Sequence, residues 1–288
     1  MFYLFPLRAM ARFLSPANVF RLGRLLEPLA QVAMRSRRVE LVSRMEKALG
    51  VGRQAGDMAR LYIRNALFRS LDDLVMDRLF ASGGARYLAF EGREHLESAL
   101  ARGRGAILLT GHFYANRAGK RYLSSIGFPV LSIRNRATPE RRSGRLGMAC
   151  LRDRYFRFLN SVIRDEVWIQ DPECTLKILK RLRANGIVNV HLDAAYSSFV
   201  YACPFLDKDG RFFPTGFLRI ARLSGAPILP TLFVGDSRSL TIRIEEPHPL
   251  ELSQDEELLI QSNLPALVGR LERQIRSHPD QWELWTQI

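Results

Sequence analysis

His112 is the side chain that the sequence best places to act as a base. It follows the apolar run 106–110, which is typical of a buried strand, and Gly111 separates the two. The ordinary pKa of an imidazole lies near 6.5, so histidine can take up a proton at neutral pH. The sequence therefore predicts a general base that a strand end presents to a hydroxyl or amine nucleophile.

The other four histidines are weaker candidates. His95 falls in an expected helix, and His248 and His278 directly precede prolines. His191 lies within an expected strand, where we predict a packed core residue. Position alone therefore favours His112 as the base.

The elements that must position His112 follow an alternating pattern from about residue 86. Expected strands are 106–110, 129–133, 187–192, 227–234 and 240–244, and expected helices are 95–101, 118–126, 141–159, 176–184, 215–223 and 264–277. This alternation predicts an α/β fold with a mostly parallel sheet flanked by helices. Residues 1–85 carry apolar positions at helical spacing. We therefore expect a helical, membrane-proximal N-terminal region, 1–85, before an α/β domain, 86–288.

Asp193 is the acid that we expect near His112. In open α/β sheets, ligands bind beyond the carboxyl ends of the strands. Both residues directly follow the end of an expected strand. The sequence therefore predicts that one site holds them both.

From His112 onward, the chain resembles the lysophospholipid acyltransferase superfamily and, more narrowly, the lauroyl/myristoyl acyltransferases of lipid A biosynthesis. The similar segments cover about two thirds of the chain in the family's order. They are Gly-His-Phe at 111–113, Ser-Ile-Arg-Asn at 132–135, the helix, turn and strand of 175–193, Pro-Phe-Leu at 204–206, Pro-Thr-Gly at 214–216, Ala-Arg-Leu-Ser-Gly-Ala-Pro at 221–227, and 271–282, which ends in Pro-Asp-Gln-Trp.

The resemblance implies a fold like that of the glycerolipid acyltransferases and a matching activity. A fatty acyl group would move from an acyl-carrier-protein or acyl-CoA thioester to a hydroxyl or amine of a lipid or amphiphilic acceptor. No metal and no cofactor are expected. The resemblance also implies a place on the cytoplasmic face of the inner membrane, peripheral or interfacially anchored. Substrate-binding residues would be Arg134, Asn135, Thr215, Gly216 and Arg222.

Arg117 departs from the family pattern, which has an acidic residue five positions after the histidine. A carboxylate there would accept the second ring N–H and fix the tautomer of His112, whereas arginine offers only donors and repels an imidazolium. Three interpretations stay open. Asp193 replaces the missing acid, or the acceptor is an amine that needs less help from the base, or the fold binds acyl lipid or carrier without turnover.

The charge balance predicts an anionic partner. The formal net charge is +14, and all but five of the 43 basic residues are arginine. An acidic carrier protein, an anionic membrane surface or nucleic acid would fit this charge. No nucleotide-binding loop and no aromatic-interleaved recognition motif supports nucleic acid, which we exclude as a partner.

The first sixteen residues predict association with a membrane surface without a span. They are rich in Phe, Leu and Met, and Arg8 and Arg12 interrupt them. No apolar run approaches the roughly 20 residues of a spanning helix. An interfacial helix fits this pattern, and so does a helix packed on the domain.

Overall fold

The computed structural model describes residues 13–81, 88–135, 165–194, 199–206, 208–236 and 239–288. Two sequence-based expectations fall outside these residues: the helix over 141–159 and the start of the chain with Arg8 and Arg12.

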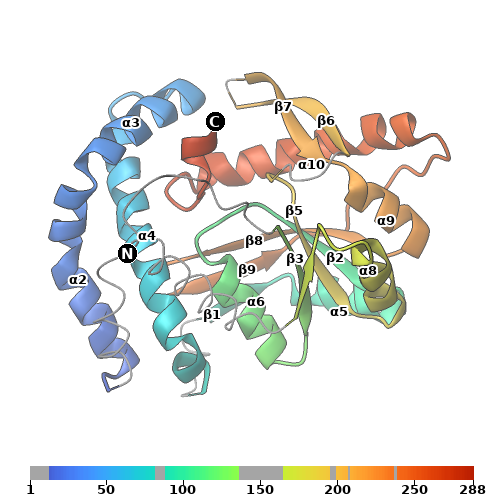
Figure 1. The fold of residues 1–288 in the computed structure, drawn as a ribbon, viewed down its shortest axis with the longest axis horizontal. Coiled ribbons are helices and arrows are strands. Elements are labelled where there is room, and N and C mark those ends of the chain that lie inside the picture. The colour runs from blue at the N-terminus through green and yellow to red at the C-terminus, as the bar shows by residue number, and fades with distance from the viewer. Residues whose placement is uncertain (1–12, 82–87, 136–164, 195–198, 207, 237–238) are drawn as a thin grey trace.

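A seven-stranded sheet forms the centre of the molecule (Figure 1). Every neighbouring pair of strands is parallel except β8 and β9, which are antiparallel. The predicted α/β fold with a mostly parallel, helix-flanked sheet is therefore confirmed. Across the sheet the order is β1 (Leu88–Glu91), β9 (Leu240–Ile244), β8 (Ile228–Gly235), β2 (Ala106–Thr110), β5 (Ile187–His191), β3 (Val130–Arg134) and β4 (Glu166–Trp168).

The five expected strands are present, each to within one residue at either end. The two edge strands, β1 and β4, were not predicted because they are short and lack a continuous apolar run. A separate antiparallel hairpin of β6 (Val200–Phe205) and β7 (Lys208–Pro214) was not predicted either. The sequence does not indicate this hairpin, because Pro204 and the charged residues at 207–209 interrupt the apolar pattern that predicts strands.

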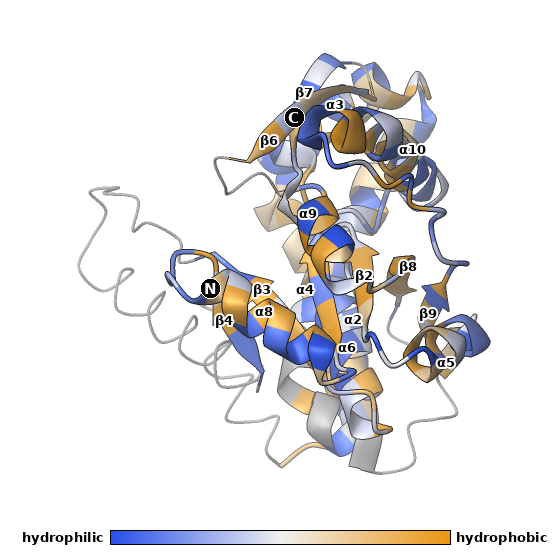
Figure 2. Cartoon of the chain, turned by 90° about the vertical axis from the view of Figure 1, so that its right-hand side faces the viewer, coloured by the Kyte–Doolittle hydropathy of each residue, from blue (hydrophilic) through white to orange (hydrophobic). Residues whose placement is uncertain are grey.

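The core lies on both faces of the sheet. Ile107 and Leu109 of β2 belong to one buried cluster, whereas Ala106 and Leu108 belong to the other. Successive strand residues point to opposite faces, so β2 is covered on both sides. In Figure 2 the strands β2 and β8 are orange, and a flanking helix such as α5 carries both colours. The covering helices are α5 (Arg93–Ala101), α6 (Asn116–Ser125), α8 (Cys174–Arg183), α9 (Gly216–Ser224) and α10 (Glu256–Ser277).

Helix α10 begins at Glu256, eight residues before the expected start at 264. Asp255 caps it, since its side chain accepts hydrogen bonds from the N–H groups of Glu257 at 2.8 Å and Leu258 at 3.1 Å. Two acidic residues in the first turn favour the same start through the helix dipole. Pro265 lies inside the helix rather than at its beginning.

Three helices precede the sheet: α2 (Pro16–Ala33), α3 (Arg35–Leu49) and α4 (Gln54–Ala81). They lie together on the left in Figure 1, so the helical character of the N-terminal region is confirmed. Gly23 lets α2 approach α4 closely, because a Cβ there would lie 2.4 Å from Leu71 Cδ1. Within the described residues, no helix has the length and hydropathy needed to cross a membrane.

Candidate active site

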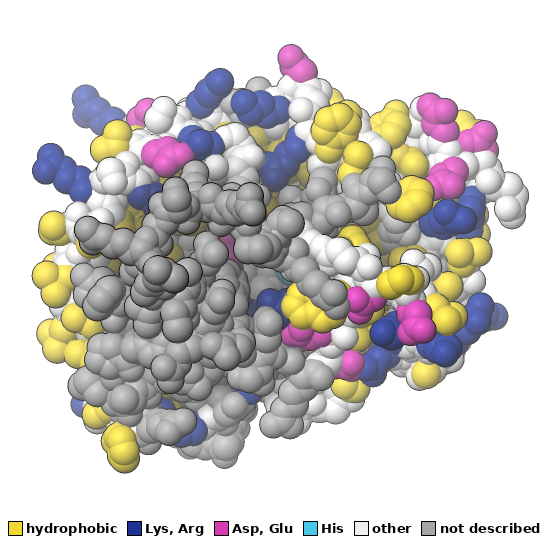
Figure 3. Space-filling view, viewed as in Figure 1, with side chains coloured by type: hydrophobic (Ala, Val, Ile, Leu, Met, Phe, Trp, Pro, Cys, Tyr) yellow, Lys and Arg dark blue, Asp and Glu magenta, His cyan; other side chains and the backbone are white. Residues whose placement is uncertain are grey.

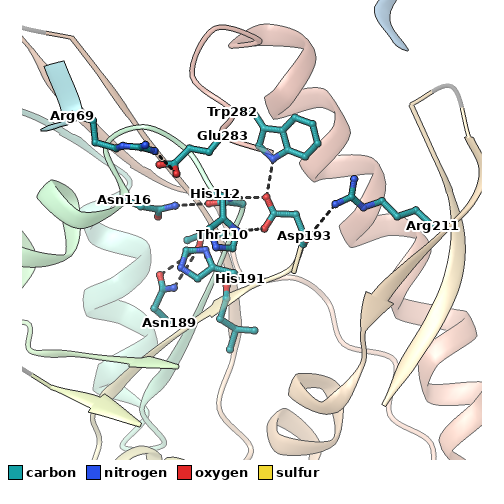
Figure 4. A network of polar contacts seen from close by, with 12 residues as sticks. Arg69, Thr110, His112, Asn116, Asn189, His191, Asp193, Arg211, Trp282 and Glu283 are labelled. Atoms are coloured by element: carbon teal, nitrogen blue, oxygen red, sulfur yellow. Dashed lines mark hydrogen bonds and ion pairs between the residues drawn. The ribbon is translucent and has the colours of Figure 1, made fainter. Parts of the chain in front are cut away.

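The register of β2 and β5 brings His112 and Asp193 together. These parallel strands pair with Thr110 opposite His191, and the Leu192 N–H donates to the Thr110 carbonyl at 2.8 Å. His112 and Asp193 each lie two residues beyond that pair. His112 Nδ1 lies 2.6 Å from Asp193 Oδ1 (Figure 4). The predicted proximity of the two side chains is therefore confirmed.

Gly111 permits this approach. A Cβ at this position would lie 2.6 Å from Leu271 Cδ1 and 3.2 Å from Asp193 Oδ2. A larger residue at this position would therefore require the Leu271 side chain to move and would crowd the Asp193 carboxylate. The glycine of the Gly-His pair therefore has a packing reason.

Asp193 is held as a carboxylate by N–H donors. Its side chain is fully buried, and Oδ2 accepts hydrogen bonds from the His112 backbone N–H at 2.6 Å and from Trp282 Nε1 at 2.7 Å. The Arg211 guanidinium donates to the Asp193 backbone carbonyl at 3.2 Å. A buried carboxylate normally costs free energy, and these donors together with the imidazole offset that cost.

The electrostatics of the pair favour an ionised acid beside a basic imidazole. Burial lowers the pKa of His112, but the charge of Asp193 and the hydrogen bond to it prevail, so the pKa is raised above 6.5. Burial raises the pKa of Asp193, but the charge and N–H groups of His112 and the Trp282 N–H hold it below its ordinary value. The carboxylate fixes the proton on Nδ1 and leaves Nε2 to accept another.

His191 belongs to this site rather than to the core that the sequence predicted for it. Its ring stacks on the His112 ring with centroids 4.1 Å apart, and its Nδ1 lies 3.2 Å from Thr110 Oγ1. As the last residue of β5, it reaches the strand end instead of the packed interior. Burial, with the charges of His112 and Lys120, holds the pKa of His191 well below its usual range, so this imidazole is neutral.

The C-terminal turn closes over the loop that carries His112. The Glu283 N–H donates to the His112 carbonyl at 2.7 Å, and Phe113 pairs with Trp282 in an isolated β-bridge. Helix α4 holds this turn: Arg69 forms an ion pair with the Glu283 carboxylate, and the Tyr62 hydroxyl donates to the Glu283 carbonyl at 3.0 Å. Sequence reasoning missed Trp282 and Glu283 as site residues, and the Pro-Asp-Gln-Trp turn was the only signal for them.

Two predicted substrate-binding residues lie at the end of β3, since Arg134 is its last residue and Asn135 follows it. Arg134 Nη1 lies 2.7 Å from Glu166 Oε1, and its guanidinium lies 5.2 Å from the centre of the Trp168 ring. The Asn135 side-chain oxygen accepts a hydrogen bond from the Gln170 amide. Both therefore lie at the carboxyl end of the sheet.

The other three lie on or next to α9. Thr215 is buried at the N-cap and its backbone N–H donates to the Phe199 carbonyl at 3.0 Å, and Gly216 is the first helical residue. Arg222 donates to the Ser253 carbonyl at 2.7 Å and thereby ties the end of α9 to the segment before α10. The structure shows no contact between Arg222 and the His112 cluster among the described residues. The substrate-binding roles of all five residues stay predictions.

Arg117 lies in the first turn of α6, half-buried. Its charge acts on Lys120, one turn further along the same helix, and lowers the pKa of that ammonium. The ring nitrogen that a carboxylate at position 117 would serve is already bonded to Asp193.

Three side chains of the site form a group that could hold a metal ion. Ligand atoms of His112, His191 and Asp193 lie within 4.8 Å of one another. Two imidazoles and a carboxylate suit a first-row transition metal. The Asp193 oxygens, however, are bonded to N–H groups of His112 and Trp282, which a metal would have to displace. The arrangement therefore fits a hydrogen-bonded acid–base pair better.

Residues 70–287 match the model of the family described as bacterial lipid A biosynthesis acyltransferase. The matched range includes the whole His112 cluster and the C-terminal turn. No curated protein matches the chain.

Proposed function

The chain belongs to the bacterial lipid A biosynthesis acyltransferase family, and we propose that it transfers a fatty acyl group to a hydroxyl or amine of a lipid acceptor. The donor would be an acyl-carrier-protein or acyl-CoA thioester. The observation that carries this proposal is the 2.6 Å contact between His112 Nδ1 and Asp193 Oδ1, because it orients a base at the open end of the sheet.

The chemistry follows from that orientation. His112 Nε2 takes the proton of the acceptor as its oxygen or nitrogen attacks the thioester carbonyl carbon. Asp193 stabilises the imidazolium that forms. The tetrahedral intermediate then expels the thiolate, which takes the proton back from Nε2. The products are an ester or amide and a free thiol, and His112 returns to its neutral form.

Asp193 also answers the question that Arg117 raises. A histidine base needs one carboxylate on its second nitrogen, and in this chain Asp193, two residues beyond the end of β5, lies in position to supply it. The proposed mechanism therefore does not require an acid at position 117. Of the three interpretations, replacement of the missing acid by Asp193 has the direct geometric support.

The assay compares the full-length protein with His112→Ala, using carrier-protein and coenzyme A thioesters and a panel of lipid hydroxyl and amine acceptors. We expect a loss of about 10²–10⁴-fold, the usual contribution of a general base. His95→Ala on α5 is the matched control. A wild-type protein without transfer across the panel, which still binds acyl lipid, would support non-catalytic binding instead.

We further propose that residues 1–85 form a membrane-proximal region and that α2 rests on the cytoplasmic face of the inner membrane. Leu25, Leu29 and Val32 are 75%, 58% and 75% exposed and recur at the i, i+4, i+7 spacing of one helix face. Figure 3 shows hydrophobic side chains along the left edge, where α2 lies in Figure 1, with Lys and Arg side chains above them. An apolar stripe beside basic residues suits an anionic lipid surface.

Vesicle sedimentation tests this surface. Leu25→Asp with Leu29→Asp should weaken binding to anionic vesicles at least about tenfold, since each change removes an apolar contact and adds repulsion. Leu252→Asp is the control, because Leu252 is also 70% exposed but precedes α10. Equal binding by both variants would reject α2 as the membrane contact.

A further inference from the structure

Lys120 is a buried lysine in a chain that otherwise keeps its lysines at the surface. It is 9% exposed, and the other four lysines are all exposed: Lys47, Lys177, Lys180 and Lys208. The chain uses arginine for nearly all its surface charge. At Lys120 it instead places the compact, titratable ammonium in the interior, so the choice of residue there needs a reason.

The position of Lys120 on α6 directs it toward His112. Asn116 lies one turn before it on the same helix face, and the Asn116 amide donates to the Gly111 carbonyl at 2.5 Å. Side chains on a helix lean toward its N-terminus. Lys120 therefore leans toward Asn116 and the helix end beside His112.

Neither polar group on that face is satisfied by the part of the chain that the structure describes. Lys120 has no hydrogen bond or ion pair with those residues, and Asn116 Oδ1 is a buried acceptor with no partner among them. Burying a charge is costly, and the carboxylates of Glu166 and Glu283 offset that cost less than Arg117 and Arg134 add to it. An anionic ligand would offset the cost at Lys120, whereas Asn116 Oδ1 is an acceptor and would need a donor such as a ligand hydroxyl.

Several charged and titratable groups of the described residues act on the Lys120 ammonium or are acted on by it. They are Arg117 of α6, Arg134 of β3, Glu166 of β4, Glu283 of the C-terminal turn, and the rings of His112 and His191. Burial, with Arg117 and Arg134, lowers the pKa of Lys120 to about 8. Lys120 is therefore mostly charged at pH 7 and loses its charge within the range in which enzymes work.

We propose that Lys120 and the first turn of α6 form a subsite for a phosphate group of the acyl acceptor, next to the base. The N-terminus of a helix attracts phosphate through its dipole and its backbone N–H groups. The phosphate of a phosphopantetheine donor is ruled out, because a long arm with two amide linkages separates it from the thioester. Only the term "acceptor" rests on the proposed acyl transfer, since the subsite itself is defined by charge and position.

Thermal shift with inorganic phosphate tests the subsite without any turnover. The full-length protein is titrated at pH 7 with phosphate, and with chloride and acetate at equal ionic strength. Phosphate should raise the melting temperature of the wild type and of Lys180→Met. Lys120→Met should weaken phosphate binding at least about tenfold, the effect of losing a charge-assisted hydrogen bond. Circular dichroism checks that the variant is folded.

The pH dependence separates this role from a merely structural one. Inorganic phosphate gains negative charge as the pH rises, which alone would strengthen its binding. In the wild type its affinity should instead fall above about pH 8, as Lys120 loses its proton. Lys120→Met should lack that fall.

Competition identifies the source of the phosphate group. Glycerol 3-phosphate stands for a soluble acceptor and detergent-solubilised lysophosphatidic acid for a lipid headgroup, and displacement of inorganic phosphate by either supports the subsite. The proposal is overturned if Lys120→Met binds phosphate like the wild type, if acetate binds as well as phosphate, or if neither organic phosphate competes. Because no thioester is present, these outcomes are independent of the His112→Ala assay.

Discussion

The two ends of the segment from Gly111 to Lys120 differ in how the charged side chain beside each end is compensated. At the β2 end, the Asp193 carboxylate accepts hydrogen bonds from the His112 ring, the His112 backbone and Trp282. At the α6 end, Lys120 is buried without an ion pair among the described residues.

The difference teaches what each end is built for. A carboxylate with several N–H donors cannot shift easily, so the first end fixes a proton on one atom of His112. At the second end, Glu166 and Glu283 do not fully offset the burial of the Lys120 ammonium and the charges of Arg117 and Arg134, which suits the anion subsite that we propose there. A base needs permanent orientation, whereas a binding subsite is completed by its ligand.

The largest effect on turnover should come from Asp193→Asn, which removes the carboxylate partner of His112. The amide keeps the shape of the side chain, but it can favour the wrong tautomer of His112 and cannot stabilise the imidazolium. We expect turnover to fall by about 10⁴-fold, as in hydrolytic triads. Asp255→Asn is the control, since asparagine caps a helix as well as aspartate. A loss below about tenfold in steady-state assays would remove Asp193 from the mechanism.

The pH dependence of activity should report the titration of both His112 and Lys120. Activity should rise as His112 loses its proton, at a pH above 6.5 because its pKa is raised. Acceptor affinity should fall near pH 8, where Lys120 becomes neutral. The ratio kcat/KM should therefore describe a narrow bell. Lys120→Met should lose the alkaline limb and keep the acid limb, and an unchanged alkaline limb would contradict the prediction.

The same groups affect stability with opposite signs. The raised pKa of His112 stabilises the fold below its unfolded pKa, and this contribution is lost as the pH rises through the folded value. The lowered pKa of Asp193 stabilises the fold above its unfolded pKa, and this contribution is lost as the pH falls through the folded value. Lys120, with its pKa lowered to about 8, costs stability while charged, so unfolding free energy should rise above that pH.

Trp282→Phe should weaken the hydrogen bonding of Asp193 but leave its contact with His112 in place. Phenylalanine keeps an aromatic ring in the buried position but removes the donor to Asp193 Oδ2. Losing a hydrogen bond to a charged group costs about 1.5–3 kcal/mol of stability, and the pKa of Asp193 should rise. We expect turnover to fall about tenfold.

Trp285→Phe is the matched control for that change. Trp285 is equally buried, but its Nε1 donates to the neutral Pro279 carbonyl at 2.7 Å. It should cost stability and leave the acid limb of the pH profile in place. Denaturant unfolding and pH profiles of both variants check this, and indistinguishable pH profiles would show that the Trp282 N–H does not tune Asp193.

The acid–base pair was predictable because it depends on features that a sequence displays. The strands ending at Thr110 and His191 are continuous apolar runs, and parallel strands end at one edge of the sheet. Equal offsets of two residues from those ends then align His112 with Asp193. The direct contact also requires β2 and β5 to be neighbours in the sheet, and the sequence did not predict that order.

The remainder of the site depends on the return of distant chain segments. Nothing near Trp282 in the sequence indicates that its N–H meets a carboxylate 89 residues earlier. Likewise, a lysine in a short amphipathic helix normally faces water, so the burial of Lys120 could not be predicted. The edge strands and the β6–β7 hairpin were missed because their residues alternate or include a proline.

The smallest effect on turnover should come from Arg117→Glu, which tests whether the two ends are independent. If His112 lacked a carboxylate partner, a carboxylate at position 117, where the resemblance leads us to expect an acid, would raise activity. His112 Nδ1, however, is already bonded to Asp193. We therefore expect kcat to stay within about threefold, because no unmet role remains for the new acid. The added negative charge lies one turn from Lys120 and should raise the pKa of that ammonium, while its repulsion weakens phosphate binding.

Arg121→Glu, further along α6, is the control for charge reversal on the helix. A large rise in kcat would mean that Asp193 does not fully replace the missing acid, and unchanged phosphate binding would separate Arg117 from the Lys120 subsite.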